Sequence, residues 1–157
     1  LDVVASILGE GRSSRLYADL ITEKSQAIEV SAWQYSQKLS GLFAVSGKPA
    51  EGQTVEALES SLQAHVDQLA AEGPTEAELE RVRNQLEVDF IEGLEEVQRR
   101  ASALNRYHYL TGDPGFVGKD LARYRALTAD DIQAAAATLN ASRRCILRVR
   151  PEDGGEQ

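Results

Sequence analysis

Histidine, cysteine and carboxylate side chains are the groups that most often bind metals or move protons in proteins. This chain holds two histidines, one cysteine and 25 acidic residues. Neither His65 nor His108 has a second histidine at helical spacing, so the paired zinc ligands of an H-x-x-E-H motif are not present. A zinc site made of both histidines and carboxylates would need distant segments to converge, and we keep it as an alternative. We expect His65 to pack beside an apolar helix stripe and His108 to pack at a helix end.

The other candidate groups also lack the neighbours that chemistry would need. Acidic residues such as Glu76 and Glu80 recur at solvent-facing helical positions, and such charged faces are ordinary helix surfaces. Ser13 and Ser14 have no histidine or lysine placed to act as a base. Cys145 stands among apolar residues in an alternating segment, so we expect a small buried strand residue. No catalytic, cofactor-binding or metal-binding residue is therefore assigned.

One glycine-rich stretch separates two apolar helical patterns; it reads Leu8-Gly9-Glu10-Gly11-Arg12-Ser13-Ser14-Arg15-Leu16-Tyr17. Glycine turns that open a helix can bind phosphate. The third glycine of GxGxxG, the lysine of a P-loop and a preceding strand are all missing here. We therefore expect a structural turn, in which glycine supplies a positive φ and Ser13 or Ser14 caps the second helix.

Helical periodicity predicts most of the regular structure. The predicted helices cover about residues 1–8, 13–24, 54–72, 75–111 with a break near Gly93, 116–127 and 128–139. Thr54 and Thr128 are expected to cap two of these helices, and Thr75 forms a capping box with Glu78. The long helix after Thr75 carries an apolar face whose members are Leu79, Val82, Leu86, Phe90, Leu94, Val97 and Leu104.

Alternating segments predict three strands. Within Ala27–Tyr35, one face holds Ile28, Val30 and Ala32, and the other holds Glu29, Ser31, Trp33 and Tyr35. Residues 42–47 are expected to pair with this strand as a hairpin. Residues 143–150 alternate again, and we expect Cys145, Leu147 and Val149 to point inward.

Composition limits the classes of function. A chain of 157 residues with 42% apolar residues is one globular domain by size, expected over residues 1–150, with residues 151–157 as a polar tail. The net charge of −8 argues against nucleic-acid binding. No apolar run is long enough for a membrane span. Because the chain starts at Leu1 and contains no methionine, we expect a fragment or a processed product.

The glycine-rich stretch, followed by Leu20-Ile21-Thr22-Glu23-Lys24 and a strand, resembles the second half-domain of the insulinase-like (pitrilysin family) zinc peptidases. Other segments come in that family's order, namely the two strands of the hairpin, Glu76 to Leu86, Arg99 to Tyr109, Gly112-Asp113-Pro114 and Leu127 to Ile132. The resemblance implies an α+β fold. It is a two-layer sandwich of the mitochondrial-processing-peptidase type, with a mostly antiparallel sheet and helices on one face.

The resemblance also implies a division of labour between two half-domains. Zinc is expected in an N-terminal half that is missing here, so this chain is expected to be inactive and to help wall a peptide-binding chamber. Its implied partners are the zinc-bearing half of the same polypeptide, a peptide substrate and a second subunit of a homo- or heterodimer. The implied source is a bacterium, with periplasm and cytoplasm both open.

Two departures from the family pattern bear on this role. Many non-zinc halves of the family place an arginine and a tyrosine beside the metal, and those positions match Ile21 and Ile28 here. Neither isoleucine can donate a hydrogen bond to a substrate. The first strand of the family's half-domain precedes Leu1, so we also expect an open sheet edge that promotes self-association.

Two alternatives stay open at this point. One is a scaffold subunit of the same superfamily that assembles complexes and never cleaves. The other is a free-standing helical binding module that only imitates the pattern. An upstream H-x-x-E-H would favour the peptidase, and its absence would favour the scaffold.

Overall fold

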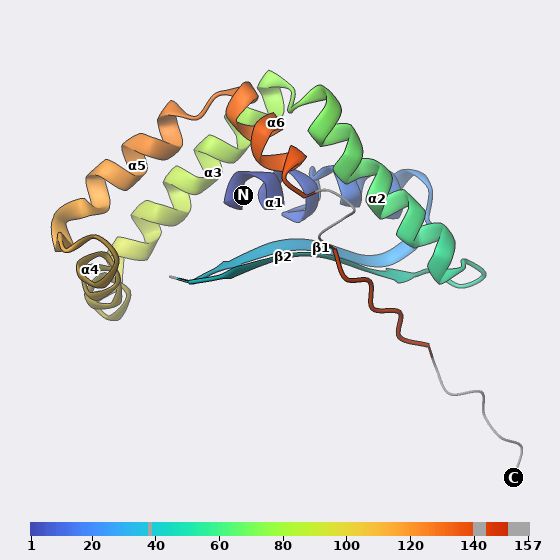
Figure 1. The fold of residues 1–157 in the computed structure, drawn as a ribbon, viewed down its shortest axis with the longest axis horizontal. Helices are drawn as coiled ribbons and strands as arrows, with labels where there is room; N and C mark the ends of the chain where they lie inside the picture. The colour runs from blue at the N-terminus through green and yellow to red at the C-terminus, as the bar shows by residue number, and fades with distance from the viewer. Residues whose placement is uncertain (38, 140–143, 151–157) are drawn as a thin grey trace, which may run out of the picture.

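The fold is a two-stranded hairpin with all of its helices on one side, as Figure 1 shows. This computed structural model describes residues 1–37, 39–139 and 144–150. The order is α1 (Asp2–Gly9), the π-helix η1 (Tyr17–Glu23), β1 (Ala27–Ser36), β2 (Gly41–Pro49), α2 (Val55–Glu72), α3 (Glu76–Glu95), α4 (Val97–Thr111), the 3-10 turn η2 (Pro114–Phe116), α5 (Val117–Ala126) and α6 (Ala129–Ala137). The predicted α+β class is confirmed.

Strands β1 and β2 are antiparallel, and their register sets which side chains face the helices. Val30 pairs with Gly47, and Val30 is buried in the core. Because side chains alternate along a strand, Trp33 lies on the opposite face. The alternation predicted that Ile28 shares the face of Val30, but Ile28 does not share that buried face: the register shifts between Ala27 and Glu29, and Ile28 is 58% exposed at this bulge.

The core lies between the hairpin and helices α1, α2, α3 and α6. Its fully buried large side chains include Val4, Ile7, Leu8, Leu16, Leu20, Leu58, Leu69, Leu79 and Val82. The predicted helix caps position these elements. Thr54 accepts a hydrogen bond from the Ala57 N–H, and capping boxes join Thr75 to Glu78 and Thr128 to Asp131. Gly73 ends α2 at a φ of +74°, as its sequence position predicts.

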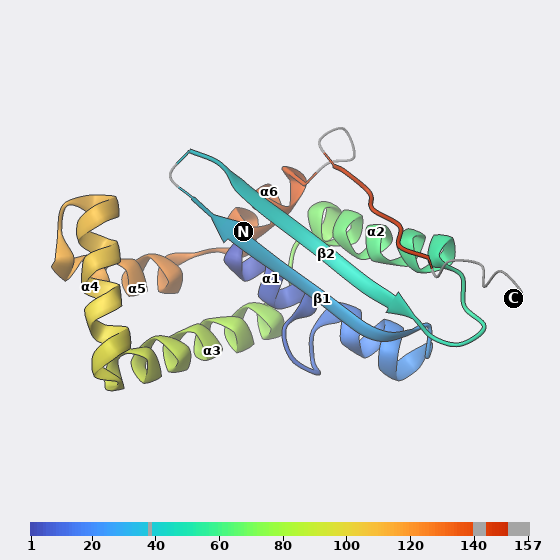
Figure 2. The same cartoon turned by 90° about the horizontal axis from the view of Figure 1, so that it is seen from below.

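The chain bends at Glu96, and the residues on both sides of this bend form a second region. We call residues 87–123 the arm; they comprise the end of α3, all of α4, η2 and most of α5 (Figures 1 and 2). The bend comes three residues later than the predicted break at Gly93. Helix α4 turns sharply away from the end of α3 in Figure 2, so the predicted apolar face does not continue along it. Val97 and Leu104 are 76% and 44% exposed, and their predicted place in the core is wrong.

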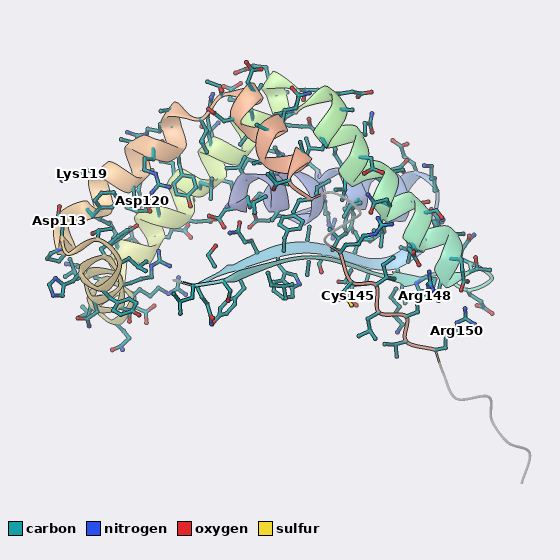
Figure 3. All side chains as sticks on the ribbon, viewed as in Figure 1. Asp113, Lys119, Asp120, Cys145, Arg148 and Arg150 are labelled. Carbon is teal, nitrogen blue, oxygen red and sulfur yellow. The ribbon has the colours of Figure 1, made fainter. Side chains whose placement is uncertain are left out.

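The predicted last strand is also wrong within the residues that the structure describes. Residues 144–150 form no strand, and Cys145 is exposed rather than buried. Leu147 and Val149 are 85% and 79% exposed. The described sheet contains only β1 and β2, and residues 144–150 form no ladder with either of them. Arg148 and Arg150 instead form ion pairs with Glu59 and Glu56 on α2, at the position that Figure 3 labels.

The predicted tail, residues 151–157, lies outside the described residues. Among the residues that are described, no helix has both the length and the apolar composition that crossing a membrane would require.

Candidate functional site

The glycine-rich turn contains two glycines with different tasks. A Cβ on Gly9 would lie 2.2 Å from the Ala32 backbone nitrogen, so the end of α1 rests directly against β1. Gly11 has a φ of +77°, and a Cβ added to it would meet no other atom within 4 Å, so only its backbone angle requires glycine. The predicted structural turn is present, and the close approach at Gly9 explains the first glycine of the motif.

The polar side chains of this turn bond to the protein itself. Ser14 is fully buried and donates its hydroxyl hydrogen to the Gly11 carbonyl. The predicted serine cap is not formed: helical structure begins at Arg15, and the Ser14 hydroxyl before it donates to Gly11 instead of accepting a bond from the helix. Arg15 donates two hydrogen bonds, of 2.6 and 2.8 Å, to the Glu78 carboxylate and a third to the Gly73 carbonyl. The turn therefore joins the start of the chain to the connection between α2 and α3.

The Arg15–Glu78 pair is the least exposed ion pair that the described residues show. The two side chains are only 13% and 20% exposed. Burial disfavours the ionised form of Glu78, but hydrogen bonds from Arg15 and from the Thr75 N–H outweigh it and lower the pKa of Glu78 to about 2. The same carboxylate closes the capping box of α3. Sequence patterns predicted the box, whereas no local signal pointed to Arg15 as the partner.

The two histidines lie on different parts of the molecule. His65 is on α2, and its Nε2 is 2.9 Å from Asp19 Oδ2. Asp19 also forms an ion pair with Lys24, and these contacts lower the pKa of Asp19 although burial acts against them. His108 lies in the last turn of α4, as predicted, but is exposed rather than packed. Helices α2 and α4 occupy opposite ends of the fold in Figure 1, so the chain does not bring the histidines together.

Metal-binding side chains do not converge elsewhere in the described chain. No group of three His, Cys, Asp or Glu residues has the arrangement that a metal ion needs in residues 1–37, 39–139 and 144–150. The two isoleucines at the family's substrate-binding positions lie near each other in the chain but differ in environment. Ile21 packs against the core from η1, whereas Ile28 is exposed at the β1 bulge. Neither offers a polar atom.

Exposed aromatic side chains lie on the face of the hairpin that points away from the helices. Trp33 and Tyr35 are 45% and 58% exposed there, and Leu42, the cross-strand partner of Tyr35, is 55% exposed. The hydroxyls of Ser31 and Ser46 share a hydrogen bond of 2.8 Å on the same face. Side chains project from this face into open space in Figure 3. We call Trp33, Tyr35 and Leu42 the open-face cluster.

The open-face cluster presents apolar side chains beside a pair of serines. Exposed aromatic and aliphatic side chains on a sheet offer apolar contact to a peptide. Ser31 and Ser46 bond to each other, and no described base lies in contact with them. Sequence alternation placed Trp33 and Tyr35 on one face of the strand. It did not identify them as candidate binding residues, because their exposure depends on which face the helices cover.

Residues 1–86 match the family model described as the peptidase M16 inactive domain. This match covers more than half of the chain. The chain belongs to this family. The predicted resemblance to insulinase-like zinc peptidases is thereby confirmed.

Similar proteins are longer than this chain. An uncharacterized zinc protease of Streptomyces coelicolor is 27% identical over 136 residues, which cover 87% of this chain and 29% of that protein. The zinc protease PqqE of Helicobacter pylori is 32% identical over 99 residues, covering 60% of this chain and 21% of its own length. The chain thus spans less than a third of these curated relatives.

The structural comparison agrees with the family match. The inactive peptidase domain of a protein described as a zinc protease, from Bordetella parapertussis, superimposes with a TM-score of 0.79 at 25% identity. That match covers 98% of this chain and 83% of the other chain. A protease from Helicobacter pylori shares the fold, with a TM-score of 0.78 at 23% identity.

Proposed function

We propose that this chain is the non-catalytic half of a zinc metallopeptidase and that its open-face cluster forms part of the wall of a peptide-binding chamber. The observation that carries the proposal is the one-sided layout in Figure 1: the helices cover one face of the hairpin, and the other face is bare. Trp33, Tyr35 and Leu42 stand on that bare face. An exposed apolar face of this kind marks a surface that meets another molecule.

Catalysis belongs, in this proposal, to a separate zinc-bearing half of the same polypeptide. Two relatives carry the name zinc protease, and both are more than three times as long as the segment they share with this chain. His65 and His108 lie at opposite ends of the fold, which fits a supporting role. The chain by itself is expected to hydrolyse no unstructured peptide and to retain no zinc. Stoichiometric zinc that is lost in His65→Ala or His108→Ala would contradict this expectation.

The contribution of this half is expected to be shape rather than chemistry. Ile28 is exposed at the β1 bulge, where many family members present a tyrosine. An isoleucine there adds apolar contact and cannot stabilise an oxyanion. The same feature favours a second candidate, a scaffold subunit of this superfamily that never cleaves. The two candidates differ in whether the complete polypeptide hydrolyses peptides when it is loaded with zinc.

Trp33 is the chain's single tryptophan, so its fluorescence reports on the open-face cluster directly. We expect an unstructured peptide with apolar side chains to shift the emission of Trp33 and to quench it in a saturable way. Tyr35→Ser with Leu42→Ser should weaken this binding about tenfold, because two apolar contacts are lost. Val97→Ser, which removes an exposed aliphatic side chain from the arm, is the matched control. Equal binding by the cluster variant and the control would reject the proposed wall.

A further inference from the structure

The arm contains a groove between its helices. The groove has a volume of about 340 Å³ and lies between α3, α4 and the start of α5, which border three sides of this region in Figure 2. Its apolar lining residues are Phe90, Leu94, Ala103, Tyr107 and Val117. Tyr107 is buried, whereas the other four are only half-buried. The volume lies within the size range of small-molecule sites, and the half-buried side chains leave apolar surface for a ligand to cover.

One wall of the groove is a stripe of α4 with a cation at each end. Arg99, Ser102, Ala103 and Arg106 line the groove, and they share one helix face because they are three, four and seven residues from the first. At 1.5 Å per residue, the two arginines stand about 10 Å apart along the helix axis. A ligand that lies along this wall therefore meets small side chains in the middle and a guanidinium at either end.

Arg106 carries a charge that the described residues do not neutralise. No ion pair among them includes Arg106, whereas Arg99 binds Glu96 at 2.9 Å. The Arg106 guanidinium lies over the Tyr107 ring, 5.6 Å from the ring centroid. A guanidinium has five N–H donors and can bind a carboxylate through two of them at once. Arg106 therefore offers a binding site for an anion at one end of the groove.

The carboxylates around the groove already have partners. Asp89, the acidic residue of the lining, accepts a hydrogen bond of 2.8 Å from Gln85 Nε2. Asp120 accepts a hydrogen bond from the Tyr107 hydroxyl and forms an ion pair with Arg123. The lining contains two arginines and one aspartate, so it is net positive in a chain whose net charge is −8. This charge favours an anionic ligand over a cationic one.

We propose that this groove binds an amphiphilic carboxylate, which is a small molecule with one carboxylate and an unbranched alkyl chain. The carboxylate accepts hydrogen bonds from Arg106, and the chain lies against Phe90, Leu94 and Ala103. Burial of this chain supplies the binding free energy, and the guanidinium selects the charge of the ligand. The site lies in the arm and contains no member of the open-face cluster, so it is separate from the proposed chamber wall.

The size of the groove favours a flexible chain over a protein segment. Two turns of an α-helix, about 10 Å across and about 11 Å long, fill roughly 800 Å³. The groove holds less than half of that volume. An alkyl chain is thin enough to enter, and each methylene that it buries strengthens binding.

Ligand binding should stabilise the arm and not the body. A molecule that binds only the closed form of a region lowers the population of the open form. Decanoate should therefore slow hydrogen exchange of the α4 and α5 amides and leave the α1 and α2 amides unchanged. Equal slowing in all four helices would contradict a site in the arm.

Calorimetric titration of the purified chain tests the chemistry of the ligand, with every probe below its micelle concentration. Decanoate should bind about tenfold more tightly than octanoate, because it buries two more methylenes. Decyltrimethylammonium has an alkyl chain of the same length and the opposite charge, and it should bind at least about tenfold more weakly than decanoate. Arg106→Gln should weaken decanoate binding about tenfold. Arg12→Gln, in the exposed turn after α1, is the matched control and should not change it.

A glycine substitution tests the position of the site. Gly93 lines the groove, and a Cβ added to it would meet no other atom within 4 Å. Gly93→Leu should therefore fill the groove without a clash and abolish decanoate binding. Gly118 on α5 has the same open space and is not a lining residue, so Gly118→Leu should bind decanoate as the wild-type chain does. Circular dichroism verifies that each variant is folded.

Several results would overturn the proposal. They are the absence of decanoate binding, equal binding of decyltrimethylammonium, and unchanged binding in Arg106→Gln or in folded Gly93→Leu. A saturable change of Trp33 emission with decanoate would place the ligand on the open-face cluster instead. Binding to phosphatidylglycerol vesicles without binding to free decanoate would assign the groove to a membrane surface and reject the small ligand. None of these measurements uses an unstructured peptide, so their failure would leave the proposed chamber wall untouched.

Discussion

The body and the arm of this domain are stabilised in different ways. In the body, which comprises the described residues outside 87–123, large aliphatic side chains such as Ile7, Leu20 and Leu69 are completely buried. Among the described residues of the arm, only Tyr107 is buried, with 5% of its surface exposed. The arm relies on polar contacts: Tyr107 donates to Asp120, and Lys119 forms an ion pair with Asp113. Figure 3 labels Asp113, Lys119 and Asp120 together at this end.

This difference indicates two levels of stability within one domain. Buried apolar area is the main source of folding free energy, whereas exposed ion pairs contribute little. The body should therefore unfold only globally, and the arm should open locally at lower cost. Tyr124, which follows the arm directly on α5, donates to Asp2 on α1 and so fixes the end of α5 to the body. Burial and this hydrogen bond to a carboxylate raise the pKa of Tyr124.

The largest effect is expected in the body, at the contact between α1 and β1. Gly9→Val would place a Cβ 2.2 Å from the Ala32 nitrogen, where neither backbone segment can move aside easily. We expect a loss of at least about 3 kcal/mol of unfolding free energy. Gly11→Val is the matched control: it has open space around it and only a strained backbone, so it should cost about 1–3 kcal/mol. Urea titration of both variants measures the difference.

An equal loss at Gly9 and Gly11 would mean that close packing of α1 on β1 does not set the stability of the body. Neither variant should alter hydrogen exchange in the arm before global unfolding begins.

The second-largest effect is expected at the Arg15–Glu78 ion pair of the body. Glu78→Gln removes the charge that neutralises Arg15, and it should cost about 2–3 kcal/mol because both groups are largely shielded from water. The pH dependence follows from the lowered pKa. Glu78 titrates at about 2 when folded, against an ordinary value of 4.5, so its stabilisation is complete above about pH 4.5 and is lost as the pH falls towards 2.

Thermal unfolding of the wild-type chain and of Glu78→Gln, measured from pH 6 to pH 2, tests this pH dependence. The wild-type chain should lose stability more steeply below pH 4.5 than Glu78→Gln does, and the two curves should converge near pH 2. Parallel curves would show that Glu78 is not coupled to Arg15 as the geometry implies. Glu87→Gln, which breaks the more exposed pair between Glu87 of the arm and Arg125, should change the curve only slightly.

Sequence patterns were most informative where the signal is local. Capping residues act within three positions, so Thr54, Thr75 and Thr128 were predicted from the chain alone and are confirmed. The buried residues of α2, Leu58, Val66 and Leu69, likewise follow the local helical spacing. The family resemblance was carried by the glycine-rich turn, whose geometry is also set locally.

Features that depend on distant partners could not be predicted in this way. The alternation of residues 144–150 is genuine, but a strand forms only when it pairs with another strand, and this segment pairs with neither β1 nor β2. The outward position of Val97 follows from a bend at Glu96 that no glycine or proline marks. The exposure of Trp33 follows from all helices packing on the other face. Arg15 and Glu78 are far apart in the sequence, and they meet only because the fold places the glycine-rich turn beside the start of α3.

The smallest effect is expected in the arm, and it tests whether this region opens on its own. Tyr107→Phe removes the hydrogen bond of 2.9 Å to Asp120 while keeping the ring that packs 6.1 Å from the Phe116 ring. Burial and the neighbouring carboxylate raise the pKa of Tyr107, so the hydroxyl stays protonated and the bond persists at neutral pH. Loss of one such bond should cost about 1 kcal/mol. Native-state hydrogen exchange should record it as faster exchange of the α4 and α5 amides alone, with α1 and α2 unchanged. If the amides of α1 slow or quicken by the same factor, the arm and the body form one cooperative unit, and the division drawn between them is wrong.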